Sequence, residues 1–154
     1  MGHFQKYIFG TLMLGGLALT IWAMYPNVPG ANPRDPVQVA LGQKIYSSNC
    51  ASCHGVDLEG ETSDWKIRKP DGFMAAPPHN DEGHTWHHED ALLFNYTKKG
   101  GNEVIPGDFK SGMPGFGEIL TDEEIWAVLT FIKSKWSVKN LERQERMSAM
   151  ARNN

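Results

Sequence analysis

The stretch NCASCHG, residues 49–55, contains both cysteines of the 154-residue chain. Cys50 and Cys53 are three positions apart, and His54 directly follows the second cysteine. Three kinds of site use such closely spaced cysteines: a redox pair, a zinc site and a site of covalent haem attachment. The partners that each kind requires elsewhere in the sequence decide among them.

The first two kinds of site need features that the sequence lacks. A thioredoxin-like redox pair accompanies a βαβ pattern, and no such pattern is found. A structural zinc site needs four ligands, usually from two cysteine pairs or from a pair with two spaced histidines, and there is no second cysteine pair. Haem attachment also explains the histidine, because Cys50 and Cys53 would form thioethers to the haem vinyl groups and His54 would bind the iron. We therefore predict one covalent c-type haem.

Composition and charge limit the class of protein. Hydrophobic residues make up 40% and charged residues 21% of the chain, as in ordinary globular domains. The net charge of −3 does not indicate a nucleic-acid-binding protein. Residues 31–136 carry ten basic and 16 acidic side chains, whereas residues 137–154 carry four basic and two acidic ones. An acidic domain is thus followed by a slightly basic tail.

The N-terminal part holds an uncharged apolar run of 18 residues, Tyr7 to Met24. This length makes it a candidate transmembrane helix. A cleaved signal peptide is the alternative, but its apolar region typically has about 7 to 15 residues and ends at an A-x-A-like site, which is absent here. We favour a single-pass anchor over residues 1–25, with Lys6 on the cytoplasmic side under the positive-inside rule. The proline- and glycine-rich residues 26–35 predict an extended tether.

Helix signals dominate the remainder of the chain. Asp35 and Pro36 are suited to the N-cap and the first position of a helix that continues to Asn49. Thr121 and Glu124 form a capping box at the start of the last helix.

A shorter helix is predicted between residues 88 and 101, with acidic residues in its first turn, lysines in its last turn, and Gly100 as its stop signal. The segments 56–80 and 101–120 are predicted to be loops, and no strand pattern is found. The predicted fold class is therefore all-α, in a domain over residues 36–136 that is followed by a tail over residues 137–154.

A haem bound by His54 leaves one axial position for a second ligand, and a methionine thioether is suitable. Of the seven methionines, only Met74 and Met113 lie inside the predicted domain. Met113 lies in the loop SGMPGFG, where Pro114 and the flanking glycines allow the backbone to approach the haem. Met74 is expected to pack against the porphyrin. We predict Met113 as the second ligand.

Residues 36–136 resemble class I cytochrome c, a small all-α domain that carries electrons. The resemblance rests on Gly42 and Tyr46 before the C-x-x-C-H motif, on the segment 76–78 (APP), on Met113–Pro114, and on the apolar stripe of residues 125–132. It implies that the first helix crosses the last one.

The resemblance also has implications for single residues. It pairs Gly42 and Tyr46 of the first helix with Val128 and Phe131 of the last. It implies that the carbonyl of Pro77 accepts a hydrogen bond from His54, which would orient this ligand and raise its basicity.

Four histidines lie within ten residues of each other, at positions 79, 84, 87 and 88. The surrounding segment, residues 76–94, is similar to that of membrane-anchored c-type cytochromes of proteobacteria. His84 and His88 have the spacing of two ligands on one helical face, but the ligand set is incomplete. We expect a structural role or hydrogen bonds to the haem propionates, with a copper or zinc site and a pH sensor as the alternatives.

Two filled axial positions leave the iron without an open coordination site, which favours electron transfer over catalysis. We therefore expect a one-electron carrier of a bacterial respiratory or photosynthetic chain and no catalytic residues. The expected location is the cytoplasmic membrane, with the haem domain on the periplasmic side. The resemblance implies a cytochrome bc1 complex as donor and a haem–copper oxidase as acceptor.

Two other functions stay open from the sequence. One is a haem enzyme, similar to a peroxidase or a nitrite reductase, in which Met113 is displaced. The other is a fixed cytochrome subunit of a larger membrane complex. For the tail over residues 137–154, the two interpretations are a frayed, solvated end and a segment that orders against a membrane partner.

Overall fold

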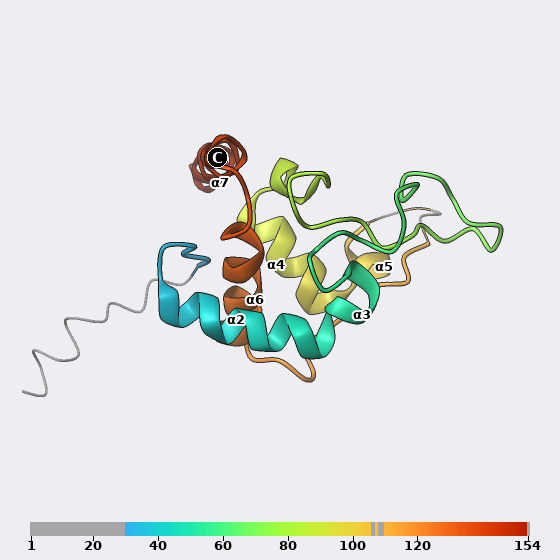
Figure 1. The fold of residues 1–154 in the computed structure, drawn as a ribbon, viewed down its shortest axis with the longest axis horizontal. Coiled ribbons are helices and arrows are strands. Elements are labelled where there is room, and N and C mark those ends of the chain that lie inside the picture. Colours follow the sequence, from blue (N-terminus) through green and yellow to red (C-terminus); the bar gives the residue numbers. More distant parts are fainter. Residues whose placement is uncertain (1–29, 106, 108–109, 154) are drawn as a thin grey trace, which may run out of the picture.

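The structure is a computed structural model that describes residues 30–105, 107 and 110–153. Within these residues the chain is helical, as predicted, and its only β-pairing is an isolated bridge between Arg68 and Met74. The elements are α2 (Pro36–Asn49), α3 (Ala51–His54), η1, a 3-10 turn (Thr85–His87), α4 (Asp90–Lys99), α5 (Gly101–Val104), α6 (Asp122–Lys133) and α7 (Val138–Arg152) (Figure 1).

The predicted anchor over residues 1–25, and residues 26–29 of the predicted tether, lie outside the described residues. Among the helices that the structure does describe, none has the length and apolar character to cross a membrane.

The helix ends lie where the local sequence signals place them. The Asp35 side chain accepts hydrogen bonds from the backbone N–H groups of Val37 and Gln38, which starts α2. The predicted capping box at Thr121 is present at the start of α6. Gly100, with φ of +85°, ends α4. The segment predicted as a loop from residue 101 differs slightly, because its first four residues form the single turn of α5.

The first long helix crosses the last helix of the domain, as the resemblance implies (Figure 1). A Cβ atom at Gly42 would collide with the backbone carbonyl of Ala127, so glycine is what allows the two backbones to approach this closely. Tyr46 and Phe131 pack with their ring centroids 5.3 Å apart. The expected pairing of Gly42 and Tyr46 with Phe131 is present, Ala127 also lies against Gly42, and Val128 belongs to the same core.

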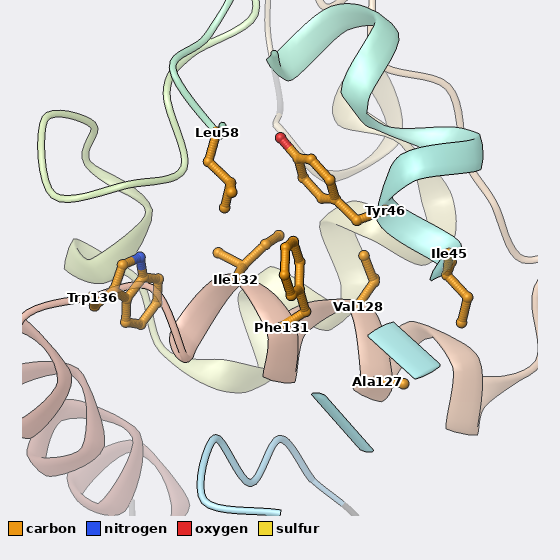
Figure 2. Close-up of a cluster of buried hydrophobic side chains, with 8 residues drawn as sticks. All are labelled: Ile45, Tyr46, Leu58, Ala127, Val128, Phe131, Ile132 and Trp136. Atoms are coloured by element: carbon orange, nitrogen blue, oxygen red, sulfur yellow. The ribbon is translucent and has the colours of Figure 1, made fainter. Parts of the chain in front are cut away.

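The hydrophobic core is built on this crossing (Figure 2). Leu58, from the loop after α3, and Trp136, from the turn after α6, extend it beyond the two helices. The buried members are Ile45, Tyr46, Leu58, Ala127, Val128, Phe131, Ile132 and Trp136. Burial of these side chains fixes the end of α2, from which the C-x-x-C-H motif continues.

The tail forms helix α7 and packs on the domain beside η1 (Figure 1). The prediction of a frayed, solvated end is therefore wrong for residues 138–152. The fully buried side chains of α7 are polar, since Gln144 is 0% and Ser148 is 2% exposed, and the partly buried Leu141 packs against the hydrophobic core. The Gln144 side-chain amide donates to the carbonyl of His88, to Asp90 and to Ser148.

A charged residue of α6 completes this contact. Lys133 is 2% exposed, and its Nζ lies 2.8 Å from Oδ1 of Asp90. We call Asp90, Lys133, Gln144 and Ser148 the α7 polar cluster. It joins the end of α6, the start of α4 and the tail helix, a connection that no apolar pattern in the tail predicts.

Candidate haem site

The two cysteines lie at the junction of α2 and α3, where the chain stays close to helical. Cys50 has helical φ and ψ angles, and its carbonyl accepts hydrogen bonds from the backbone N–H groups of Cys53 and His54. Residues three apart on a helical turn share one face, so the two thiols lie on the same side of α3. Both cysteines are free, Cys50 partly buried and Cys53 exposed.

The chemistry of Cys50 argues against a reactive thiolate. Burial, and to a smaller extent the neighbouring Cys53, raises the pKa of Cys50 to about 11. Thiol–disulfide exchange uses the thiolate form, which this environment disfavours at Cys50. Two free cysteines on one helical face, next to a histidine, fit covalent attachment to a haem.

His54 is held with one ring nitrogen available. Its ring is buried, and Nδ1 lies 2.9 Å from the carbonyl oxygen of Pro77, the hydrogen bond that the resemblance implies. A carbonyl only accepts, so Nδ1 carries the proton and Nε2 keeps its lone pair for a metal. Burial lowers the pKa of His54 although the bond to Pro77 opposes this effect, which also favours the neutral, metal-binding form.

The loop after α3 folds back to hold Pro77 in this position. The backbone N–H of Gly60 donates to the His54 carbonyl over 2.8 Å. Two hydrogen bonds join Glu61 to Ala76, directly before Pro77. The Glu61 N–H donates to the carbonyl of Ala76, and the Glu61 carboxylate accepts from the Ala76 N–H. Gly60, with φ of +83°, leaves no room for a Cβ atom against Pro78. The loop is therefore ordered by bonds to the motif that it covers.

Met113 is supported by a different part of the chain. Its N–H donates to Ser111 Oγ, and its carbonyl accepts from the N–H of Gly101 at the start of α5. A Cβ atom at Gly100 would contact the backbone from Met113 to Gly115, so this loop lies tightly against the end of α4. The structure thus connects Cys50, Cys53, His54 and Pro77 directly, whereas the role of Met113 as second ligand stays a prediction.

The four clustered histidines contact different aromatic neighbours. The structure contains no group of three or more potential ligands within its described residues. His84 and His88 flank the single 3-10 turn of η1 rather than lying on one face of an α-helix. Their rings still meet edge to face, with centroids 5.2 Å apart. His84 stacks on Trp65 with ring centroids 4.9 Å apart, and His87 packs on Trp86 at 3.8 Å.

Two buried polar atoms of this region lack a protein partner within the part of the chain that the structure describes. They are Nδ1 of His84 and Nε1 of Trp86. Buried polar groups are nearly always hydrogen-bonded, so these atoms indicate that another group completes the site. The carboxylates of haem propionates would satisfy them, as the sequence led us to expect. The residues present therefore fit a haem.

Sequence reasoning missed one contact at the site. The ring of His79 stacks on that of His54, with centroids 4.0 Å apart and planes inclined by 24°. The only signal for it was the position of His79 two residues after Pro77, because the stacking depends on how the loop folds back over α3.

Comparison with known proteins agrees with this geometry. The family model for cytochrome c matches residues 39–136. Cytochrome c6 of Diacronema lutheri is 28% identical over 97 residues, which are 63% of this chain and 95% of that protein. The cbb3-type cytochrome c oxidase subunit CcoP of Rhodobacter capsulatus is 29% identical over 102 residues, 66% of this chain but only 31% of that subunit.

Two further comparisons complete the picture. Thiosulfate dehydrogenase of Stutzerimonas stutzeri is 27% identical over 111 residues, which are 71% of this chain and 31% of that enzyme. No solved structure matches at a significant level. The family match covers well over half of the chain and includes the whole C-x-x-C-H motif. This chain belongs to the cytochrome c family, and its cofactor is covalent haem c, whose iron serves electron transfer.

Proposed function

We propose that the protein is a one-electron carrier whose haem iron is held between His54 and Met113. The observation that carries this proposal is the hydrogen bond from His54 Nδ1 to Pro77, because it leaves Nε2 as the metal-binding nitrogen beside the two free cysteines. The haem supplies the redox centre, and the protein supplies its anchorage, its axial ligands and its exclusion from water.

Each part of the site has a separate task in this proposal. Cys50 and Cys53 attach the cofactor, so that it stays bound in both oxidation states. His54 is fixed in its tautomer by Pro77. Met113, on a loop held by Ser111 and Gly101, closes the second axial position and keeps small ligands away from the iron. A six-coordinate iron changes charge without exchanging ligands, which suits electron transfer.

The proposed partners are a cytochrome bc1 complex as donor and a haem–copper oxidase as acceptor. Similarity to CcoP of Rhodobacter capsulatus and FixP of Sinorhizobium medicae, both subunits of cbb3-type cytochrome c oxidases, supports an oxidase as the acceptor. The proposed location is the periplasmic face of a bacterial cytoplasmic membrane, with residues 1–25 as anchor. Tethering would keep the domain at high effective concentration near partners in the same membrane.

The visible spectrum of the purified protein tests this function. Both axial ligands should be detected in the oxidised form, including the long-wavelength sulfur–iron band of methionine ligation. Met113→Ala should abolish this band and lower the potential, whereas Met74→Ala should leave the band intact. Loss of the band in the Met74 variant instead would move the second ligand to that residue. A haem that is extracted by acid–acetone would contradict covalent attachment through the cysteines.

The similarity to thiosulfate dehydrogenase supports one alternative, a haem enzyme with a displaceable Met113. Turnover of thiosulfate or peroxide by the purified protein, together with a wild-type spectrum that lacks the sulfur–iron band, would favour it. The other alternative is a fixed subunit, which the similarity to CcoP and FixP, both subunits of cbb3-type cytochrome c oxidases, supports. Co-purification with an oxidase in constant stoichiometry after detergent extraction would favour the fixed subunit over a mobile carrier.

A further inference from the structure

The stacking of His79 on His54 places a second imidazole against the axial ligand. The ring centroids are 4.0 Å apart, so the face of the His54 ring that His79 covers has no space in which to turn. Pro77 holds the His54 ring at one nitrogen. A single hydrogen bond still lets the His54 ring turn about the axis of that bond. The stacked ring removes that remaining freedom.

His79 is itself held at three points. Its Nδ1 shares a hydrogen bond of 2.8 Å with Oγ1 of Thr85, which is only 6% exposed. Its backbone N–H donates to the carbonyl of Leu58, and its carbonyl accepts from the indole Nε1 of Trp136, each over 2.8 Å. Leu58 and Trp136 belong to the hydrophobic core, so the core fixes the backbone of His79 and Thr85 fixes its ring.

An apolar side chain of similar volume could fill the same space, but it would not have a fixed plane. The Thr85 hydroxyl selects one orientation of the His79 ring, and the ring transmits this orientation to His54. Groups around a metal site commonly orient its ligands in this way. From these contacts we propose that His79 is a positioning residue that sets the plane of the His54 imidazole relative to the haem.

This inference rests on the proposed ligation of the haem by His54. The plane of an axial imidazole determines how unpaired spin is distributed over a ferric haem. The g values in electron paramagnetic resonance (EPR) and the proton NMR shifts of the haem methyl groups report this distribution. A role in packing alone would leave the g values and the order of the four haem-methyl resonances unchanged as long as the haem stays bound and six-coordinate.

The experiment uses the full-length ferric protein and four variants. His79→Leu removes the stacked ring, His79→Phe keeps a flat ring without the hydrogen bond, and Thr85→Val removes only the hydroxyl. Gln43→Leu is the control, because Gln43 is exposed on α2 and belongs to neither the haem site nor the histidine cluster.

We expect His79→Leu to shift the haem-methyl resonances and to broaden the largest-g feature. Thr85→Val should change both spectra in the same direction but less, His79→Phe should stay closer to the wild type than His79→Leu, and the control should match the wild type. Wild-type spectra in either His79→Leu or Thr85→Val would overturn the proposal.

The remaining outcomes are also informative. If His79→Leu does not accumulate as a haem protein, the Thr85→Val spectrum alone decides, since this nearly isosteric change leaves the stack in place. If the spectra of His79→Phe resemble those of His79→Leu, stacking of a flat ring on His54 does not set its plane. A wild-type protein without a histidine-ligated low-spin signal would instead show that the proposed function itself is wrong, before any variant is compared.

Discussion

Helix α6 uses two different kinds of contact along its length. Near its middle it crosses α2 through apolar surfaces, where Gly42 lies against Ala127 and Tyr46 against Phe131. At its C-terminal end it meets α7 and α4 through the α7 polar cluster, in which Lys133 and Gln144 are almost fully buried. The crossing gains stability from apolar burial, whereas the polar cluster must satisfy every buried charge and amide.

This difference determines how each contact responds to mutation. The crossing is limited by space, so the damaging changes there are those that add atoms. The α7 polar cluster is limited by partners, so the damaging changes there are those that remove one member and leave the others unpaired. The buried Oε1 of Gln144 has no hydrogen-bond partner within the described residues. Even the intact cluster therefore leaves one acceptor without a donor.

The largest effect is expected at the crossing. Gly42→Val would place a branched side chain against the backbone carbonyl of Ala127, which cannot move aside without separating the helices. Overpacking costs about 1 to 3 kcal/mol and occasionally more. Because the obstacle here is backbone, we expect the unfolding free energy to fall by an amount at the upper end of this range, about 3 kcal/mol. Chemical denaturation followed by tryptophan fluorescence would measure it.

A matched control for this change is available one residue away. Gln43 is exposed on the same helix, so Gln43→Val adds a β-branched residue without a collision. Its cost should reflect helix propensity alone, about 0.5 kcal/mol or less. Equal losses in the two variants would show that close approach of the helices does not depend on Gly42.

The next effect is expected at the buried ion pair. Lys133→Met would leave the carboxylate of Asp90, which is 20% exposed, without its nearest cation and with only the more distant, exposed Arg152 at 4.0 Å. Breaking a fully buried pair costs about 3 to 5 kcal/mol, and the partial exposure of Asp90 reduces the expected loss to about 2 to 3 kcal/mol. Adding Asp90→Asn should recover part of this loss, because it removes the carboxylate charge that has lost its nearest cation and keeps an acceptor for Gln144. A double variant less stable than Lys133→Met would contradict this account.

The two contacts also differ in how well the sequence predicts them. Asp35, Gly100 and Thr121 gave correct helix ends because caps depend on residues within one turn. The packing of α7 was missed because the tail has a broken apolar pattern, and Gln144 finds its partners more than 50 positions away in the sequence. Periodicity reports apolar faces, and a buried polar face carries no such signal.

The residues of the candidate site also differ in whether local sequence or the fold determines them. Cys50, Cys53 and His54 form one local motif that the sequence alone identifies. The resemblance supplied Pro77, and the structure contains its bond to His54. The stacking of His79 could not be predicted, since it requires the fold of the loop between residues 55 and 85. The role of Met113 rests on the sequence and the resemblance and awaits its spectrum.

A smaller effect is expected from the amide of the α7 polar cluster. Gln144→Leu would keep most of the side-chain volume but remove one donor from Asp90, from Ser148 and from the His88 carbonyl. Lys133 still donates to the Asp90 carboxylate and the Asp90 N–H still donates to Ser148, so the His88 carbonyl is the acceptor left without its donor. Buried groups left unpaired cost about 1 to 3 kcal/mol, and removal of the unpaired Oε1 offsets part of this, so we expect about 1 to 2 kcal/mol.

Arg146→Ala, on an exposed face of the same helix with an ion pair of 3.7 Å to Glu142, is the control for Gln144→Leu. Exposed pairs of this kind contribute about 0.3 to 0.5 kcal/mol. If both variants lose the same unfolding free energy, the buried amide of Gln144 does not hold α7 on the domain. The deletion of residues 138–154 would then also cost little.

The smallest effect is expected at Asp81, which attaches the start of α7 to the loop that carries the histidines. Its carboxylate accepts from the Ser137 N–H and from the Asn140 side chain. Burial alone would raise the pKa of Asp81, but these hydrogen bonds outweigh it and hold the pKa below its usual value. A lowered pKa stabilises the folded state above the unfolded value of about 3.9, and this contribution is lost as the pH falls through the folded pKa.

Asp81→Asn should therefore lose less unfolding free energy than the wild type between about pH 7 and about pH 3. The difference should stay below about 1 kcal/mol, because Asp81 is exposed and solvent screens its interactions. Glu61→Gln is the comparison outside α7, since bonds to Ala76 and Lys69 likewise lower the pKa of Glu61. We expect urea denaturation at the two pH values to show, in both variants, a smaller decrease in unfolding free energy on acidification than in the wild type. Only Asp81→Asn should also change amide-exchange protection of α7 at low pH. If the unfolding free energy of Asp81→Asn and of the wild type decreases equally on acidification, the ionised carboxylate contributes nothing to the docking of α7.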